Sequence, residues 1–573
     1  MLRRTIVLFC LVTLAVAGSG GSAGAADPIG RMISAMTLPE KVGQLFVSYV
    51  YGAGATSATA AEMAANRALF GADVSTGAEA VAKYHLGGVI YFTWTNNLAN
   101  PAQIATLSNG LQQSAVANGG IPLQISTDQE GGVVNRIGAP LAVSPGNMAI
   151  GATFDPISAF QAARVSGTEL RALGVNMVDA PVVDVNTNPL NSADGPRAFG
   201  DRTGQVSLFG ASAVAGYRAA GIGAQAKHFP GLGDTTVNTD NGVAVTDQTR
   251  AQIMATQVPP FRAAIAAGVP SIMAAHIVAP ALDPSRRPAS LSRPIVTGLL
   301  RGTLHYDGVV ITDALDAAAL NDIPADQIVL DAVNAGIDQL LMPRNPSAAF
   351  QTLLDAVTSG AISEARIDQS VRRILRMKTQ LGLFDGPYVP APLVGTPERL
   401  QAMAGIAARS ITALRAAALP LRAGQNVLVA GWGVTTTANL TNALTARGLT
   451  ATRLYTGSPS AGVIAQAVAA AQAADVAVVT TSNVWGDVTQ QNLMRALLAT
   501  GKPIVIASVG GPYDIAYFPA AETYLAAYDF QPVSVAALAD VLAGRARATG
   551  RLPVTIRTPD GSTVLFRYGA GSR

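Results

Sequence analysis

Short apolar runs alternate with longer alanine-rich segments between residues 44 and 342, and this alternation limits the possible folds more than any other feature. The runs are mostly continuous in apolar residues, which is typical of parallel strands buried on both faces. One intervening segment has Asp155 and Pro156 as helix start signals and Gly174 as a stop signal. Eight βα units predict an α/β fold, a (β/α)8 TIM barrel, over residues 27–384. The eight predicted strands are residues 44–48, 88–92, 123–127, 175–178, 223–227, 271–275, 309–312 and 339–342.

A second, shorter alternation follows a segment rich in proline and glycine. Gly386, Pro387, Pro390, Pro392 and Pro397 predict a linker over residues 385–400. Alanine-rich and leucine-rich segments separate the later strands, which predicts a smaller doubly wound α/β sandwich domain over residues 401–573. Its predicted strands are residues 427–430, 453–455, 476–480, 504–508 and 524–527.

The N-terminus reads as a secretory signal peptide over residues 1–25, which predicts a secreted or extracytoplasmic protein. Arg3 and Arg4 precede an apolar stretch at residues 5–17, and residues 23–25 form a small-residue cleavage site. An uncleaved N-terminal anchor is the alternative. The single cysteine, Cys10, lies inside the apolar stretch. A mature chain would therefore lack thiols, which excludes thiol catalysis, disulfides and cysteine-ligated metals.

Composition narrows the classes of partner. The net charge is +3, and no cluster of lysine and arginine interleaves with aromatic residues, so no nucleic-acid partner is predicted. After the first twenty residues no run of 18 apolar residues occurs, so no integral membrane association is expected after signal cleavage. The oligomeric state stays open.

Polar residues cluster where the predicted barrel strands end, which is where barrel enzymes place their chemistry. Carboxylates with interspersed cations suit a polyhydroxylated ligand, since a hydroxyl both donates and accepts hydrogen bonds. Paired carboxylates also fit glycoside hydrolysis. The residues at these strand ends are Asp128, Glu130, Arg136, Asp179, Asp184, Lys227, His228, His276 and Asp313.

Neither a metal nor another cofactor is predicted. The four histidines, which include His228 and His276, show no HxH or HxxxH spacing, although a metal site remains the rival interpretation of the acidic ring. The Gly431-Trp432-Gly433 turn lacks the third glycine of a dinucleotide-binding fingerprint, because Thr436 stands there. A tight strand-to-helix turn is the simpler interpretation.

Ordered motifs along nearly the whole chain resemble glycoside hydrolase family 3, close to its bacterial two-domain β-N-acetylglucosaminidases. Any one of these motifs could arise by chance, whereas the series in this order is highly specific. The motifs are residues 36–45, 87–90, 128–132, 197–200, 227–231, 306–313, 373–375, 381–384 and 552–554.

The resemblance implies a retaining reaction in which Asp313 is the nucleophile and forms a glycosyl-enzyme intermediate. It also implies a set of residues that hold the hydroxyls of the terminal sugar. The alternative is that Lys227 and Asp128 merely neutralise each other. The implied substrate-binding residues are Asp128, Arg136, Arg197, Lys227 and His228.

The chain departs from that branch in the loop after Lys227-His228. The branch normally carries Gly-His-Gly and then Asp-Ser-His, and the last histidine is the general acid and base. Here both histidines are absent, Asn238 replaces the aspartate and Asp240 replaces the catalytic histidine. The ordinary pKa of an aspartate is ~3.9, so this pKa must be raised before the side chain can donate a proton at neutral pH. Asp240 is therefore the predicted acid/base, with Asp234 as the fallback.

Other interpretations of this loop stay open. Asp240 can be a solvated loop residue, the enzyme can act only on good leaving groups, or the protein can bind sugar without cleaving it. Asp487 of the second domain is a further candidate acid, and Trp485 or Trp94 can stack on a sugar.

The resulting expectation is a secreted, exo-acting, retaining β-N-acetylhexosaminidase. Its partner is a carbohydrate, and it releases terminal β-linked N-acetylglucosamine from cell-wall or chitin-type fragments. The identity of the sugar comes from the resemblance alone. The alternatives are a β-glucosidase or β-xylosidase of the same family, or a non-catalytic sugar-binding protein.

Overall fold

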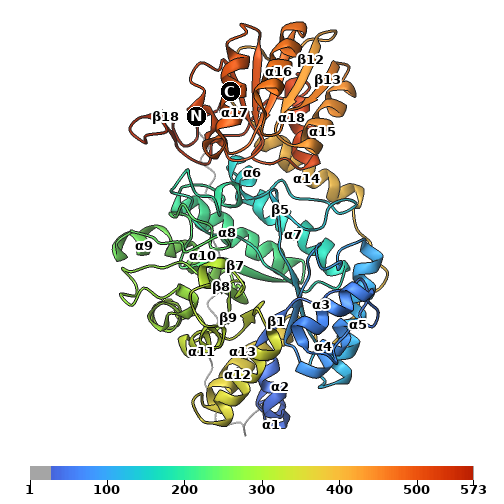
Figure 1. Ribbon diagram of the computed structural model, residues 1–573, viewed down its shortest axis with the longest axis vertical. Helices are drawn as coiled ribbons and strands as arrows, with labels where there is room; N and C mark the ends of the chain where they lie inside the picture. Colours follow the sequence, from blue (N-terminus) through green and yellow to red (C-terminus); the bar gives the residue numbers. More distant parts are fainter. Residues whose placement is uncertain (1–26, 572–573) are drawn as a thin grey trace, which may run out of the picture.

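The computed structural model describes residues 27–571, and the predicted signal peptide lies outside them. Two sheets organise the described residues, one of eight strands and one of six. Figure 1 shows two bodies along the long axis of the molecule, the N-terminal one coloured blue to yellow and the C-terminal one orange to red. Within residues 27–571, no helix combines the length and apolar character needed to cross a membrane.

The larger sheet closes into the predicted barrel. Its paired strands are parallel and follow the order β10-β1-β2-β3-β6-β7-β8-β9. A parallel bridge between Ile311 and Gln339 joins the two ends of that order. Each strand lies within two residues of its predicted bounds. The strands are β1 (Phe46–Ser48), β2 (Gly88–Ile90), β3 (Gln124–Thr127), β6 (Met177–Val178), β7 (Gly223–Phe229), β8 (Ser271–Ala274), β9 (Val309–Thr312) and β10 (Leu340–Leu341).

Helices cover the outside of the barrel. The helix predicted after Asp155 is α7 (Pro156–Ala172): the Asp155 side chain accepts a hydrogen bond from the Ile157 N–H at 3.0 Å, and Gly174 turns the chain at a φ of 81°. The other helical segments are α1 (Pro28–Ala35), α2 (Leu38–Gly43), α3 (Ala60–Phe70), α4 (Gly77–Tyr84), α5 (Pro101–Ala117), α6 (Asn147–Ala152), η1 (Gly195–Arg197), α8 (Thr203–Ala219), α9 (Arg250–Thr256), α10 (Val258–Ala266), η2 (Ala289–Leu291), the π-helical η3 (Pro294–Thr303), η4 (Ala318–Leu320), α11 (Ala325–Ala335), α12 (Pro346–Thr358) and α13 (Glu364–Gln380).

The smaller sheet has the order β11-β16-β15-β14-β12-β13, and its core strands are parallel. Buried side chains of α15 and α18 pack on one face, and those of α16 and α17 pack on the other, as in a doubly wound domain. The elements are β12 (Asn426–Gly431), α15 (Val434–Thr445), β13 (Thr450–Tyr455), α16 (Ala461–Ala473), β14 (Val476–Thr481), η5 (Val484–Gly486), α17 (Val488–Leu498), β15 (Ile504–Ser508), η6 (Pro512–Tyr517), β16 (Thr523–Ala526) and α18 (Pro532–Leu542).

Two features of this half were not predicted from the sequence. The edge strand β11 (Thr412–Ala416) runs antiparallel to β16. It follows helix α14 (Pro397–Ser410) almost directly and contains Ala, Leu and Arg, so no turn signal or β-rich composition marks it. The first turn of α14 also occupies residues 397–400, the last four residues of the predicted linker.

The C-terminal domain rests on the side of the barrel that carries α6. Met148, Ala149 and Ala152 of α6 are buried in the same apolar cluster as Leu552 and Val554. The segment with these two residues lies just before the hairpin of β17 (Ile556–Arg557) and β18 (Val564–Phe566). This contact holds the second domain beside the loops that follow the barrel strands.

Candidate active site

A cavity of about 440 Å³ opens at the carboxyl ends of the barrel strands. Its apolar floor is the upper layer of the barrel interior, which includes Ile90, Phe92 and Met273. All seven residues given a catalytic or substrate-binding role in the sequence analysis line this cavity. They are Asp128, Arg136, Arg197, Lys227, His228, Asp240 and Asp313.

Two cations and two carboxylates interlock in one wall. The Lys227 Nζ lies 2.7 Å from Asp128 and 2.8 Å from Glu130. Arg197 donates two hydrogen bonds to Glu130, at 2.9 and 2.7 Å. Burial by itself would raise the pKa of Glu130, but Arg197 and Lys227 lower it well below its usual range. Lys227 and Asp128 do pair, and both also line the cavity.

A short hairpin brings Arg136 back over the cavity. Strands β4 (Gln129–Gly131) and β5 (Val134–Asn135) pair antiparallel, and the Gln129 side chain accepts hydrogen bonds from the Arg136 and Ile137 N–H groups. Gly132 turns at a φ of 58°, and a Cβ there would lie 2.9 Å from the Cα of Gly146. Arg136 then lies 3.7 Å from Asp128, so both side chains face the same part of the cavity.

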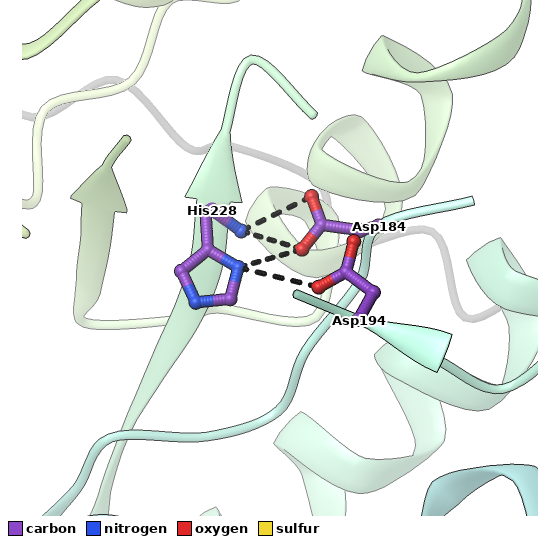
Figure 2. A group of neighbouring side chains, drawn as sticks. All are labelled: Asp184, Asp194 and His228. Atoms are coloured by element: carbon purple, nitrogen blue, oxygen red, sulfur yellow. Dashed lines mark hydrogen bonds and ion pairs between the residues drawn. The ribbon is translucent and has the colours of Figure 1, made fainter. Parts of the chain in front are cut away.

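His228 is fixed by carboxylates behind the cavity wall. Figure 2 shows its Nδ1 directed toward Asp184 and Asp194, at 2.7 and 3.9 Å. Asp184 also accepts hydrogen bonds from the backbone N–H groups of His228 and Leu232. The other ring nitrogen, Nε2, lies 3.3 Å from Arg197, a group that only donates. Asp184 therefore positions both the imidazole and the start of the loop that follows β7.

Asp184, Asp194 and His228 are also the one group within residues 27–571 whose side-chain ligand atoms lie close enough together to hold a metal ion. The geometry of this cluster is that of a hydrogen-bond network, because N–H groups of His228 and Leu232 already donate to the Asp184 oxygens. Neither carboxylate oxygen of Asp194 has a hydrogen-bond partner among the described residues. Burial and the neighbouring Asp184 raise the pKa of Asp194 to about 8, so this carboxyl holds a proton at neutral pH. Metal ligands bind in their deprotonated form. A protonated Asp194 beside Asp184, whose oxygens already accept hydrogen bonds, therefore makes a poor metal site.

Asp313 follows β9 and faces the cavity with its charge stabilised. Its Oδ1 accepts a hydrogen bond from the Ala314 N–H at 2.8 Å. Burial would raise the pKa of Asp313, but His228 and His276 offset this and hold it below its ordinary value. His276 is itself fixed by Ser290 at 2.7 Å. Asp313 is therefore an anion at neutral pH, as a carboxylate nucleophile must be.

The loop after β7 places its two candidate acids differently. Asp240 lines the cavity, and its backbone N–H bonds to the Asn238 side chain at 2.9 Å. Asp234 instead accepts hydrogen bonds from the hydroxyls of Thr187 and Thr246, at 3.3 and 3.1 Å, and does not line the cavity. The placement favours Asp240 over the fallback residue.

Asp487, the candidate acid in the second domain, has a structural role. Asp487 caps α17 by accepting hydrogen bonds from the Thr489 and Gln490 N–H groups, and neither it nor Trp485 lines the cavity. In contrast, Trp94 is 52% exposed and stacks at 5.0 Å on Phe92, which does line the cavity.

Several carboxylates in or behind the cavity wall received no role in the sequence analysis, among them Asp184, which was noted only at a strand end. Glu130 was noted at a strand end, and its spacing of two from Asp128 is the one signal that places both on the same side of a strand. Asp194 lies in an irregular segment that gave no signal. Asp316, three residues after Asp313, also lines the cavity.

Comparison with known proteins identifies the family. The model of the glycosyl hydrolase family 3 N-terminal domain matches residues 37–377. Beta-hexosaminidase A of Pseudoalteromonas piscicida is 34% identical over 549 residues, which cover 83% of this chain and 90% of that protein. A beta-N-acetylglucosaminidase/beta-glucosidase of Cellulomonas fimi is 29% identical over 510 residues, with coverage of 82% and 88%.

A solved structure extends the likeness to both domains. It is a family 3 beta-N-acetylglucosaminidase from Paenibacillus sp. str. FPU-7, 36% identical, with a TM-score of 0.84 over 91% of this chain and 100% of that chain. The motif-based resemblance and the predicted two-domain α/β fold are confirmed. The chain belongs to glycoside hydrolase family 3 and is a glycoside hydrolase.

Proposed function

We propose that this protein is a secreted, exo-acting, retaining β-N-acetylhexosaminidase that releases terminal β-linked N-acetylglucosamine from cell-wall or chitin-type fragments. The observation that carries the proposal is the Asp313 carboxylate, which is held as an anion in a cavity lined by paired cations and carboxylates. The choice of sugar follows the names of the beta-hexosaminidase and beta-N-acetylglucosaminidase relatives.

In this proposal the wall of Lys227, Asp128 and Arg136 holds the hydroxyls of the terminal sugar. Lysine and arginine only donate hydrogen bonds and the carboxylate only accepts, so the set fixes the direction of each hydroxyl. Arg197 and His228 complete the wall, and Glu130, which also lines the cavity, keeps the cations in place. The cavity volume of about 440 Å³ lies in the range of sites for small ligands.

Asp313 then attacks the anomeric carbon, and Asp240 donates a proton to the departing glycosidic oxygen. The covalent glycosyl-enzyme forms as the bond to the leaving group breaks. Water, deprotonated by the Asp240 carboxylate, attacks the same carbon and releases the sugar with its original configuration.

Two other functions remain candidates, each with an observation in its favour. Hydrolysis of a β-glucoside is favoured by the Cellulomonas fimi relative, whose name gives both beta-N-acetylglucosaminidase and beta-glucosidase. Sugar binding without turnover is favoured by the absence of the loop histidines from the sequence.

A panel of 4-nitrophenyl glycosides separates these candidates. We expect the N-acetyl-β-glucosaminide to have a higher kcat/KM than the β-glucoside and β-xyloside. A preference for the glucoside would change the substrate assignment, and calorimetric binding without turnover would remove the enzymatic one. Secretion is tested separately: the N-terminus of protein recovered from the medium should lie near residue 26.

A further inference from the structure

We propose that an arginine-lined cleft between the two domains is a second binding site, which takes the carboxylate-bearing chains of a cell-wall glycan. The cleft has a volume of about 580 Å³ and shares no lining residue with the catalytic cavity. It lies where the hairpin of β17 and β18 meets the loops of the barrel. The site anchors the protein to a polymer independently of turnover, so the inference goes beyond the proposed function.

The positive charge of the chain is concentrated in the segment that forms one side of this cleft. Residues 541–573 contain six arginines and one aspartate, which gives this segment a net charge of +5. The rest of the chain therefore carries −2, since the total is +3. Only 13% of all residues are charged, so the excess is a local feature, and it favours an anionic partner at this segment.

The fold brings three arginines to the cleft, two from this segment and one from the barrel. Arg557 lies in β17, Arg567 directly follows β18, and Arg202 directly precedes α8. Arg557 directs a hydrogen bond to the carbonyl oxygen of Gly561 at 3.3 Å. Both arginines of the hairpin are exposed, and within residues 27–571 neither has a carboxylate partner.

The aspartate that lines the cleft is already bonded to the protein. Asp201 accepts a hydrogen bond from the Thr555 N–H at 2.7 Å, and its other carboxylate oxygen lies 3.3 Å from the Arg202 Nε. Arg202 also donates to the Thr555 hydroxyl at 2.8 Å, and its guanidinium lies 5.3 Å from the ring centre of Tyr568. These contacts hold the two walls of the cleft together, so the arginines of the hairpin lie on a preformed surface.

One segment of the barrel borders both the cleft and the catalytic cavity. Thr187 and Pro189 line the cleft, and Ala193 and Arg197, a few residues later, line the cavity. The Thr187 hydroxyl also donates to Asp234, in the loop after β7, at 3.3 Å. The two sites therefore lie on the same side of the barrel, and a polymer held in the cleft raises the local concentration of chain ends near the cavity.

The chemistry of the cleft selects an acidic glycan. A guanidinium group donates two parallel hydrogen bonds, which match the geometry of a carboxylate. Chitin-type fragments are neutral, whereas the glycan of a bacterial cell wall carries carboxylates on its lactyl and peptide groups. Binding of a carboxylate polymer follows from the arginines alone, and the choice of a cell-wall glycan rests on the proposed function.

The test is sedimentation of the full chain with insoluble peptidoglycan from which phosphate polymers have been removed. We expect wild-type protein to bind, and the double variant Arg557→Gln/Arg567→Gln to bind roughly tenfold more weakly. The difference should shrink when NaCl is raised from about 0.05 to about 0.5 M, because salt screens charges at an exposed site. Hydrolysis of 4-nitrophenyl N-acetyl-β-glucosaminide should be unchanged, because neither arginine lines the catalytic cavity.

Arg250→Gln/Arg262→Gln is the matched control. These two exposed arginines lie on α9 and α10 and line neither the cleft nor the cavity, so their removal should leave binding at the wild-type level. Unchanged binding by the cleft variant, or an equal loss in the control, would overturn the inference.

Chitin powder and polyphosphate are the comparison polymers. We expect weaker binding to both, and arginine-dependent binding of equal affinity to either one would refute the assignment to carboxylates. The assay requires no turnover, so an inactive protein that still binds peptidoglycan through these arginines would contradict the proposed function and support the second site.

Discussion

Arg197 and Glu130 meet through two hydrogen bonds in the wall of the cavity, from Nε to Oε2 at 2.9 Å and from Nη2 to Oε1 at 2.7 Å. The same Oε1 lies 2.8 Å from the Lys227 Nζ. One buried carboxylate thus holds two of the cations that line the cavity, so the wall depends on a residue that the sequence analysis gave no role.

Glu130→Gln should damage both folding and substrate binding. The change leaves Arg197 and Lys227 buried with too little negative charge, which costs on the order of 3–5 kcal/mol of unfolding free energy. The displaced cations should also raise KM. Chemical denaturation and steady-state kinetics measure the two effects. Glu169→Gln, which breaks the buried ion pair with Arg399 away from the cavity, should destabilise the protein and leave KM unchanged; equal KM effects would contradict the prediction.

Asp313→Asn should reduce turnover by about 10⁴-fold or more, because it removes the proposed nucleophile while preserving the shape of the side chain. Wild-type protein treated with an activated 2-fluoro glycoside should carry the sugar on the Asp313 peptide in a mass spectrum. A label on another residue, or inverted product in an NMR time course, would refute the retaining mechanism.

Asp240→Ala should slow chitobiose hydrolysis by about 10²–10⁴-fold and the 2,4-dinitrophenyl glycoside far less. Azide should restore turnover of the activated substrate by attacking the glycosyl-enzyme without base assistance, and a glycosyl azide should appear as product. Asp234→Ala serves as the comparison, since that residue bonds to Thr187 and Thr246 outside the cavity. If Asp234→Ala shows this leaving-group dependence instead, the acid has been misassigned.

Treatment with EDTA should leave activity and thermal stability unchanged, because Asp184 is already occupied by N–H donors and Asp194 is protonated. For the same reason Asp194→Asn, which resembles the neutral acid, should keep kcat/KM within about threefold of wild type. Asp184→Asn should lower it much more, because it disturbs His228 and the loop start. Chelator-sensitive activity that Zn²⁺ restores would show that a cation occupies this cluster.

Lys378→Met should stabilise the protein at neutral and acidic pH. Burial lowers the pKa of Lys378 to about 7, and its ammonium has Gln44 as a neutral partner at 2.7 Å. Between about pH 7 and 10.5 the unfolded chain binds this proton and the folded one does not, so wild-type stability should rise with pH across that window.

The methionine variant should lack this rise and should be more stable at pH 7 by an amount on the order of a few kcal/mol. Denaturation at a series of pH values measures the difference. Lys83→Met, at an exposed lysine on α4, is the control. Parallel stability curves for wild type and Lys378→Met would show that the buried amine does not titrate in this range.

Local patterns in the sequence determined the architecture of this protein. Continuous apolar runs of strand length can be satisfied only by burial on both faces, so all eight barrel strands and the strands β12 to β16 lie close to their predicted positions. The order of the motifs likewise identified Asp128, Arg136, Arg197, Lys227, His228, Asp240 and Asp313, which lie far apart in sequence and line one cavity.

The tertiary structure decided which charge stabilises which. Glu130, Asp194 and Asp316 acquire their surroundings from segments tens of residues away, and Asp487 proved to be a helix cap. A sequence motif records a residue type and its local spacing, whereas the proton affinity of a carboxyl depends on burial and on charges brought near it by the fold. The sequence therefore determined the barrel and the ring of polar residues at its mouth, and only the folded chain decided which carboxyls stay charged and which retain a proton.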